Sequence, residues 1–333
     1  MTMQRNSFPA HPSTNLNTDR VKAFSLVLLT ALLVTACGGA DAGQAAGGSG
    51  LSGTVRVDGS STVAPLSTVA AEMFQEAGPG VQVTVGTSGT GGGFEKFCVG
   101  ETDVSNASRP ITDDERSMCA ENGLAFVELQ LANDALTVVV NRDNTWIDCI
   151  TIDQLSAIWE PDSRISNWNQ VDPRFPDEEL TLFGAGTDSG TFDYFTEAVN
   201  GEEGASRTDY AATEDDNVTV QGVSGSPGGL GYFGYSYFEQ NSDSLKALEI
   251  DDGNGCVAPT PQTAQDGTYS PLARPLFVYP SVQAVSRPEV AAFLDFYVQN
   301  AATIAVEALF IPLNAEQQAQ LEQAANSLLE PVS

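Results

Sequence analysis

The sequence predicts an α/β fold with a largely parallel sheet, and three features of the chain lead to this class. Short runs of β-branched residues alternate with segments of helical periodicity along most of the chain. Glycine-rich patches that also carry serine or threonine stand between predicted strands and the helices that follow them. The 333 residues suffice to bury a sizeable core, in one two-lobed domain or in two domains. Ligands of such folds bind at the carboxyl ends of the strands, where these patches lie.

The first part of the chain supplies the predicted elements in regular alternation. Acidic residues directly after Thr112 indicate a helix start, because acids in the first turn suit the helix dipole. Residues 103–107 lead into the segment Ser108-Arg109-Pro110. The other predicted elements are strands at 54–57, 81–85 and 124–129 and helices from about 63 to 75 and from about 94 to 99.

The second part continues the alternation with a long buried strand. The apolar, β-branched run at 136–141 predicts a strand that crosses between lobes. Thr151 is expected to cap a helix over 151–159, and Ser189 lies near the N-cap of a helix over 191–199. The remaining predictions are strands at 180–183 and 276–279, a surface loop and helix within 200–217, a glycine–aromatic strand edge near the cleft at 228–235, a long loop at 251–270, and helices from about 288 to 299 and from about 315 to 329.

The N-terminus carries the features of a secretory signal. Arg20 and Lys22 precede an apolar run from residue 23 to 36, which is shorter than the roughly 20 residues that span a bilayer. Cys37 follows directly after small residues, and this arrangement resembles the bacterial lipobox. The resemblance implies removal of residues 1–36 and diacylation of Cys37; an ordinary signal peptide with an incidental cysteine is the alternative. Residues 37–52 are mostly Gly, Ala and Ser, which is typical of a flexible tether.

The composition argues against several classes of function. The net charge is −30, and Lys96 and Lys246 are the only lysines beyond residue 36, so nucleic acid is an improbable partner. The single histidine, His11, lies in the segment expected to be removed. A mature chain without histidine has no Ser-His-Asp triad, no Cys-His dyad and no histidine-ligated zinc. We therefore expect no catalytic residues, no cofactor and no metal.

Four cysteines remain after Cys37, namely Cys98, Cys119, Cys149 and Cys256. In an exported protein this number suggests two disulfides, for which three connectivities exist. We favour Cys98–Cys119 and Cys149–Cys256, because the first pair brackets a single loop-and-strand unit. Metal ligation is the alternative, although no CxxC spacing is present.

Three glycine-rich patches and one arginine suggest a site for a small tetrahedral oxyanion. A helix start carries unpaired backbone N–H groups and a partial positive charge, so it attracts anions. Hydroxyl side chains add donors, although a single serine or threonine in such a place is more often only a helix cap. The patches are residues 59–62, 87–93 and 188–191, and the arginine is Arg109.

These motifs resemble those of the phosphate-binding proteins of bacterial phosphate ABC transporters, the PstS-like family. The resemblance covers most of the mature chain and rests on the order and spacing of DGSSTVAP (58–65), SGTGGGF (88–94), ASRPI (107–111), DSGTF (188–192) and LGYFGY (230–235). It implies a type II periplasmic-binding-protein fold, in which two α/β lobes close on phosphate. It also implies delivery of phosphate to a membrane permease driven by a separate ATPase.

The resemblance assigns site residues position by position. It implies that Ser61 and Thr62 hold phosphate from the first lobe through hydroxyl and N–H groups. Thr90 stands where the family has a serine donor. The second lobe contributes a Ser-Gly-Thr segment, here Ser189, Gly190 and Thr191.

Two positions depart from the family pattern and change the charges expected at the site. Ala185 stands where many members have an arginine, and Ser108 stands where many have an aspartate. We expect Arg109 to supply the missing cation, because a planar guanidinium suits phosphate. A surface ion pair with Asp113 or Asp114 is the alternative for Arg109.

A carboxylate that accepts the proton of phosphate would discriminate against sulfate. Asp134, just before the run at 136–141, is the first candidate for this acceptor, and Asp58 and Asp188 are alternatives. The competing interpretation is that Asp134 is only a structural cap or turn residue.

The sequence thus predicts a monomeric, lipid-anchored, extracytoplasmic solute-binding protein for inorganic phosphate, whose partners are the permease subunits of an ABC importer. The alternatives are a binder or sensor of another oxyanion such as sulfate, an extracellular phosphatase on the same fold, and a structural or adhesive surface protein. Lobe 1 is expected to comprise residues 53–138 and 258–333, and lobe 2 residues 139–257.

Overall fold

The computed structural model describes residues 50–78 and 80–329. The predicted signal segment at 1–36, Cys37 and most of the tether at 37–52 lie outside the described residues. Within the described ranges, no helix is at once long and apolar enough to cross a membrane.

The fold is mixed α/β, and its main sheet carries strands in the order β2-β1-β3-β12-β4-β8-β6-β7, with β9 also paired to β4. A smaller sheet has the order β11-β10-β5. The strands are β1 (Ser52–Gly59), β2 (Gly80–Val85), β3 (Val104–Ala107), β4 (Leu129–Asn141), β5 (Cys149–Thr151), β6 (Thr181–Ala185), β7 (Ala211–Thr213), β8 (Gly229–Gly234), β9 (Leu245–Ala247), β10 (Glu249–Asp251), β11 (Cys256–Val257) and β12 (Ala273–Pro280).

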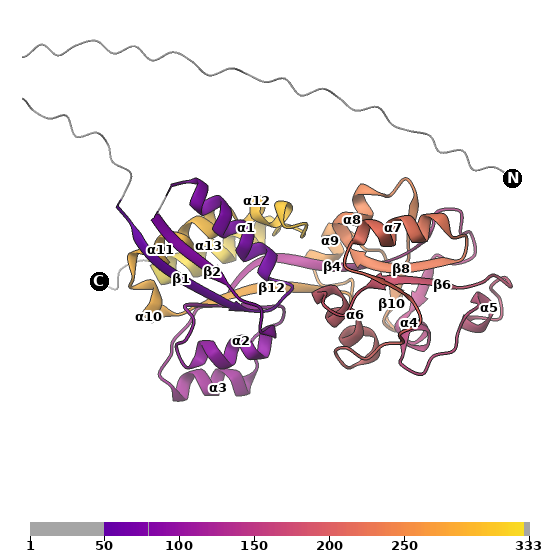
Figure 1. The fold of residues 1–333 in the computed structure, drawn as a ribbon, viewed down its shortest axis with the longest axis horizontal. Helices are drawn as coiled ribbons and strands as arrows, with labels where there is room; N and C mark the ends of the chain where they lie inside the picture. The colour runs from indigo at the N-terminus through magenta and orange to yellow at the C-terminus, as the bar shows by residue number, and fades with distance from the viewer. Residues whose placement is uncertain (1–49, 79, 330–333) are drawn as a thin grey trace, which may run out of the picture. The chain divides into compact units, whose positions relative to one another are not determined.

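The main sheet is parallel at its two ends and antiparallel in the middle. β1 pairs in parallel with β2 and β3, and β6 pairs in parallel with β7 and β8. Between these groups, β12 is antiparallel to β3 and β4, and β4 is antiparallel to β8. Figure 1 shows β4 and β12 running side by side between the two groups of elements. The predicted parallel sheet is therefore correct within each group, while the two strands that cross between them run in opposite directions.

Helices cover both groups of strands. The helices are α1 (Ala64–Glu76), α2 (Gly89–Cys98), α3 (Asp113–Glu121), α4 (Ile152–Trp159), α5 (Trp168–Val171), α6 (Gly190–Asn200), α7 (Asp216–Gly225), α8 (Tyr235–Gln240), α9 (Pro261–Gln265), α10 (Val282–Val285), α11 (Pro288–Gln299), α12 (Ala301–Glu307) and α13 (Ala315–Leu329). Capping boxes fix two predicted starts, because Thr112 and Thr151 each exchange hydrogen bonds with the third residue of the helix that follows.

The hydrophobic core is divided between the two groups. Near β1, the core packs α1, α11, α12 and α13 on the sheet, and Phe293 is among its fully buried side chains. Near β6 and β8, the core is aromatic: Phe195 stacks on Tyr232 with ring centroids 3.7 Å apart, and both rings adjoin Trp159. The lobe boundaries given above stay a prediction.

Several expectations about single elements differ from the structure. Of the segment 124–129, Leu129 is the first residue of β4, and Phe126 makes only an isolated bridge to Ser281, beyond the end of β12. β8 lies inside the sheet between β4 and β6, not at an edge; its Gly231 lets α7 pack closely, since a Cβ there would press on Val223. The loop at 251–270 contains β11 and α9.

The helix predicted from about residue 94 begins earlier, at Gly89. Glycine has low helix propensity, so the run at 89–93 carries no helical signal of its own. Packing explains the extra turn: Gly93 lies so close to Gly59 of β1 that a Cβ on Gly93 would be 2.5 Å from the Gly59 Cα.

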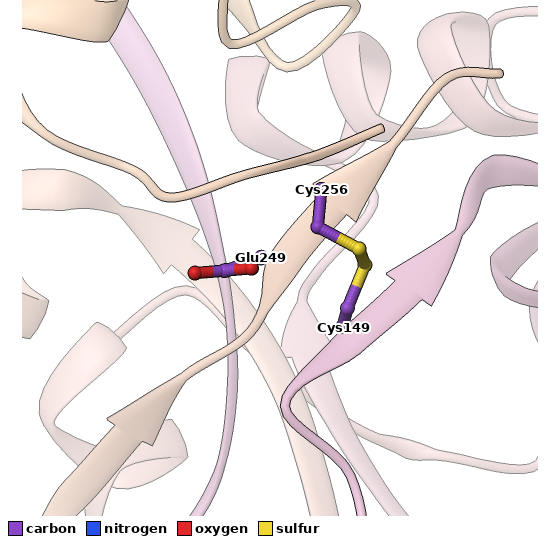
Figure 2. A group of neighbouring side chains, drawn as sticks. All are labelled: Cys149, Glu249 and Cys256. Atoms are coloured by element: carbon purple, nitrogen blue, oxygen red, sulfur yellow. A yellow bond between two sulfur atoms is a disulfide. The ribbon is translucent and has the colours of Figure 1, made fainter. Parts of the chain in front are cut away.

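Both favoured disulfides are confirmed. Cys98 is bonded to Cys119, which joins α2 to α3, and Cys149 is bonded to Cys256 in the smaller sheet. Figure 2 shows the second bond with Glu249 beside it, a grouping of two cysteines and a carboxylate that resembles a metal-ligand set. Metal ligation needs thiolate sulfur, and the two sulfurs are consumed by the disulfide, so this cluster is structural.

Candidate functional site

A cavity of about 680 Å³ lies where α1, α2 and α6 begin. The starts of α1 and α2 follow β1 and β2, and the start of α6 follows β6, so the cavity lies at the carboxyl ends of strands from both groups. Six of the nine predicted anion-binding residues line it: Ser61, Thr62, Thr90, Ser108, Arg109 and Gly190.

The start of α1 has no side-chain cap, and its first N–H, that of Ala64, donates to the Ser60 carbonyl at 3.0 Å. The N-cap residue is Val63, which has no side chain that could accept a hydrogen bond from the first turn. Ser61 and Thr62 directly precede it and line the cavity. The chain reaches this position through Gly59, which has a φ of 137° and where a Cβ would overlap the Asn106 carbonyl. These hydroxyls therefore lie beside a helix start that no side chain caps.

The start of α2 is similar. Its N-cap, Ser88, makes no capping hydrogen bond; the Ser88 hydroxyl instead donates to Asp58 Oδ1 at 2.8 Å. Within the first turn of α2, the Thr90 Oγ1 atom lies 3.2 Å from Ser108 Oγ, and Ser108 N donates to Thr90 Oγ1 at 3.3 Å. The predicted donors Thr90 and Ser108 thus form one pair on the cavity wall.

The start of α6 touches the start of α1 across the site. Ser189 is the N-cap of α6 and accepts a hydrogen bond from Thr191 N at 3.1 Å, as its predicted position suggested. Gly190 lies against Thr62 so closely that a Cβ on Gly190 would be 2.7 Å from Thr62 Oγ1 and 3.0 Å from Thr62 N. Glycine is required here by the contact between α6 and α1.

The other three predicted residues line an adjoining cavity of about 690 Å³. They are Asp134, Ser189 and Thr191. Ser61, Thr62 and Gly190 line both cavities and therefore form the wall between them. The structure thus brings all nine predicted residues together around a single contact between α1 and α6.

Arg109 reaches the cavity, but its guanidinium is already engaged. Its Nη1 and Nη2 atoms each donate to Glu115 at 2.8 Å, and this carboxylate also closes the capping box of α3. The ion pair expected as the alternative therefore exists, with Glu115 in place of Asp113 or Asp114. The hydrogen bond to Glu115 holds the pKa of Arg109 above its usual value, so the residue stays charged.

Sequence reasoning missed a second arginine, Arg274 of β12. It lines the same cavity, its side chain is 12% exposed, and its Nη2 donates to Thr62 Oγ1 at 2.9 Å. The sequence does contain one indication of its role. Arg274 is a lone cation at the start of an otherwise apolar strand, in a chain with only 14 lysines and arginines.

Arg274 explains the position of Asp134. The register of the antiparallel β4–β12 pair places the two residues directly opposite each other, and Arg274 Nε donates to Asp134 Oδ2 at 3.3 Å. Burial raises the pKa of Asp134, although the adjacent guanidinium opposes this shift. Asp134 is thus a partner of Arg274 in the wall of the adjoining cavity.

The alternative acceptors are placed differently. Burial disfavours the charge of Asp58, but hydrogen bonds from Lys96 at 2.6 Å and from Ser88 outweigh it and lower its pKa. Asp58 therefore acts as an anchor for α2. Asp188 stands directly before the N-cap of α6, and its backbone N–H donates to Glu214.

The cavity also carries carboxylates that the sequence did not single out. Asp193, Glu197 and Glu203, from α6 and the loop after it, also line the cavity. Burial and the neighbouring Glu203 raise the pKa of Asp193. The cavity therefore offers proton acceptors as well as donors.

Residues 44–301 match the PBP superfamily domain. The chain is 49% identical over 265 residues to protein SphX of Synechococcus elongatus, which covers 79% of this chain and 78% of SphX. It is 39% identical over 297 residues to the phosphate-binding protein PstS of Staphylococcus saprophyticus, covering 87% of this chain and 90% of PstS.

Solved structures agree with this relationship. A possible phosphate binding protein from Planctomyces limnophilus has 48% sequence identity and a TM-score of 0.80, and the alignment covers 84% of this chain and 100% of that one. PstS from Borrelia burgdorferi, at 22% identity, shares the fold with a TM-score of 0.60 over 79% of this chain and 99% of that one. The chain belongs to the PBP superfamily and, within it, to the family that includes SphX and the phosphate-binding protein PstS.

Proposed function

We propose that this protein captures inorganic phosphate between its lobes and does so as a binding protein, without catalysis. The observation that carries the proposal is the meeting of three helix starts at one cavity, two of them without a side-chain cap. Uncapped N–H groups at a helix start favour an anion, and hydroxyls and arginine add the donors that a tetrahedral oxyanion needs. The phosphate-binding names of PstS and of the P. limnophilus protein support phosphate as the anion.

Apart from the acceptor Asp134, the proposed ligand set is the one that the sequence predicts. Ser61 and Thr62 act from the start of α1, Thr90 and Ser108 from the wall beside α2, and Arg109 from the segment after β3. The second lobe contributes the start of α6, Ser189, Gly190 and Thr191. Because α1 and α6 already touch at Thr62 and Gly190, an anion bound beside this contact draws donors from both lobes, which favours their closure on it.

Selectivity for phosphate over sulfate requires an acceptor for the phosphate proton. Asp193 is the carboxylate we propose for this role, because it lines the same cavity as Gly190 and burial raises its pKa. Asp134, the first candidate from the sequence, is engaged by Arg274 and lines the adjoining cavity.

Calorimetric titration of the anion-free protein with phosphate and then sulfate at neutral pH tests the proposal. Tight binding of phosphate with little response to sulfate is the expected result. Equal binding of both anions would favour a general oxyanion binder, and binding of neither would refute the anion site.

We further propose that the protein is exported, lipid-anchored at Cys37, and delivers phosphate to the permease of an ABC importer. The signal-like segment at 1–36 and the cysteine that follows it support export and anchoring, and the relationship to PstS supports delivery. Cys37→Ser should move the protein from the membrane fraction to the medium or the periplasm. A cell that lacks the protein should take up phosphate more slowly at low concentration, and unchanged uptake would count against delivery.

A further inference from the structure

Arg274 has three of its sides fixed by contacts from different parts of the fold. Asp134 of β4 accepts from Nε at 3.3 Å, and Thr62 at the start of α1 accepts from Nη2 at 2.9 Å. The guanidinium carbon lies 3.5 Å from the ring centroid of Tyr194 of α6. Tyr194 is itself held, because its hydroxyl donates to the Pro271 carbonyl at 2.7 Å. One cation therefore contacts a crossing strand, the first lobe and the second lobe at once.

The remaining side of Arg274 faces the cavity. A guanidinium has five N–H donors in a planar fork. Within the described residues, hydrogen bonds engage Nε and Nη2 of Arg274, and Nη1 has no hydrogen-bond partner. The residue lines the cavity beside Thr62 and Gly190.

Arg109 offers the informative contrast. Both of its terminal nitrogens donate to Glu115, so the two-nitrogen edge that could grip an oxyanion is occupied. Arg274 meets its carboxylate through Nε, which leaves donors of the terminal nitrogens for a ligand.

We propose that Arg274 is a direct ligand of the bound anion and the main cation of the site, with Asp134 and the Tyr194 ring as the residues that position it. This inference rests on the proposed function, because the anion in question is phosphate. Binding to Arg274 places the anion against Thr62 and Gly190, where the starts of α1 and α6 meet. Arg274 belongs to β12, one of the two strands that cross between the lobes. An anion bound to Arg274 is therefore linked to the strands about which the lobes would move.

The experiment is calorimetric titration of the anion-free protein with inorganic phosphate. Arg274→Lys keeps the charge opposite Asp134 and removes the planar fork, and phosphate should bind it at least fivefold more weakly. The double variant Arg274→Gln with Asp134→Asn removes both buried charges together, which avoids an unpaired carboxylate, and should lose at least tenfold in affinity. Arg56→Gln is the matched control: it removes one positive charge from a partly exposed ion pair with Asp103, away from the cavity, and should leave the affinity within twofold.

The outcomes separate the two proposals. If the unaltered protein does not bind phosphate, the proposed function fails before any variant is compared. If it binds and the Arg274 variants bind equally well, this inference is overturned while the proposed function stands. A crystal structure of the phosphate complex decides the case without a variant: a terminal nitrogen of Arg274 within about 3.2 Å of a phosphate oxygen is expected, and a longer separation would contradict the inference.

Discussion

Gly190 provides a direct test of the idea that the starts of α1 and α6 must meet for phosphate to bind. An alanine there keeps the backbone N–H, so no donor to the anion is lost. Its Cβ would lie 2.7 Å from Thr62 Oγ1, 3.0 Å from Ser61 Oγ and 3.0 Å from Thr62 N, whereas ordinary contacts are 3.4 Å or longer. The threonine hydroxyl can rotate, but the Thr62 backbone nitrogen cannot, so the two helix starts must separate by about 0.4 Å or more.

The expected cost follows from overpacking of close contacts. Forcing an extra carbon into such a contact typically costs about 1–3 kcal/mol, which corresponds to a phosphate affinity roughly 5- to 150-fold weaker. The variant should not be less well folded, because alanine in place of glycine favours a helix by up to about 1 kcal/mol and separation of the lobes relieves the clash. The loss should therefore appear in binding and not in the melting temperature of the anion-free protein.

Calorimetry of Gly190→Ala with phosphate measures the affinity, and small-angle scattering with and without phosphate measures closure of the lobes. Gly225→Ala is the control, because Gly225 ends α7 and a Cβ there would have no neighbour within 4 Å. Gly190→Ser should lose more affinity than Gly190→Ala. An affinity for Gly190→Ala within twofold of that of the unaltered protein would refute the argument that this contact is part of the bound state.

Three further predictions concern charge and covalent links. Asp134→Asn should change the affinities for phosphate and sulfate by the same factor, because Asp134 positions Arg274; calorimetry that shows a changed ratio would restore it as the proton acceptor. Burial and the neighbouring Asp215 and Glu214 raise the pKa of Asp216 to about 6, so the folded state binds its proton more tightly than the unfolded state and stability falls as pH rises from about 4 to 6. Asp216→Asn should thus raise the free energy of unfolding at pH 7 by up to about 3 kcal/mol, and by much less at pH 4. Thermal unfolding should therefore show a larger rise in melting temperature at pH 7, and equal rises at the two pH values would contradict this. Replacing Cys149 and Cys256 with alanine opens a loop of 107 residues and should cost about 2–5 kcal/mol in urea unfolding, with phosphate affinity unchanged; reduced affinity would mean that the bond shapes the site.

Local signals account for the parts of the fold and site that the sequence predicts well. The helix starts at Thr112 and Thr151 follow from capping boxes that span four residues. The glycine–hydroxyl patches stand directly after β-branched runs, so their place at the strand ends needs no knowledge of the tertiary structure. Such signals predicted the residues around the contact between α1 and α6 but not the contact itself.

Long-range pairing accounts for what could not be predicted. Arg274 is 140 residues from Asp134 and 212 residues from Thr62 in sequence, and only the register of β12 against β4 brings them together. The position of β8 in the sheet also depends on long-range pairing. Its glycines suggested a strand at the edge of the sheet, but β8 lies between β4 and β6, and the glycines allow α7 to pack closely. The departure at Ala185 directed attention to Arg109, a cation inside one of the family-like motifs, while an arginine from a distant strand already faced the cavity.

The charges around the cavity also explain how so acidic a chain can hold an anion. Each arginine that lines the cavity has a carboxylate partner, Glu115 for Arg109 and Asp134 for Arg274, so the two arginines add little net charge to the site. Attraction of phosphate then depends on donors fixed in direction: N–H groups at helix starts, hydroxyls and the outer edge of one guanidinium. Such donors act at hydrogen-bond distance, whereas exposed carboxylates are screened beyond roughly 8–10 Å at physiological ionic strength. The net charge of −30 therefore bears on how fast phosphate reaches the protein more than on how tightly it is held.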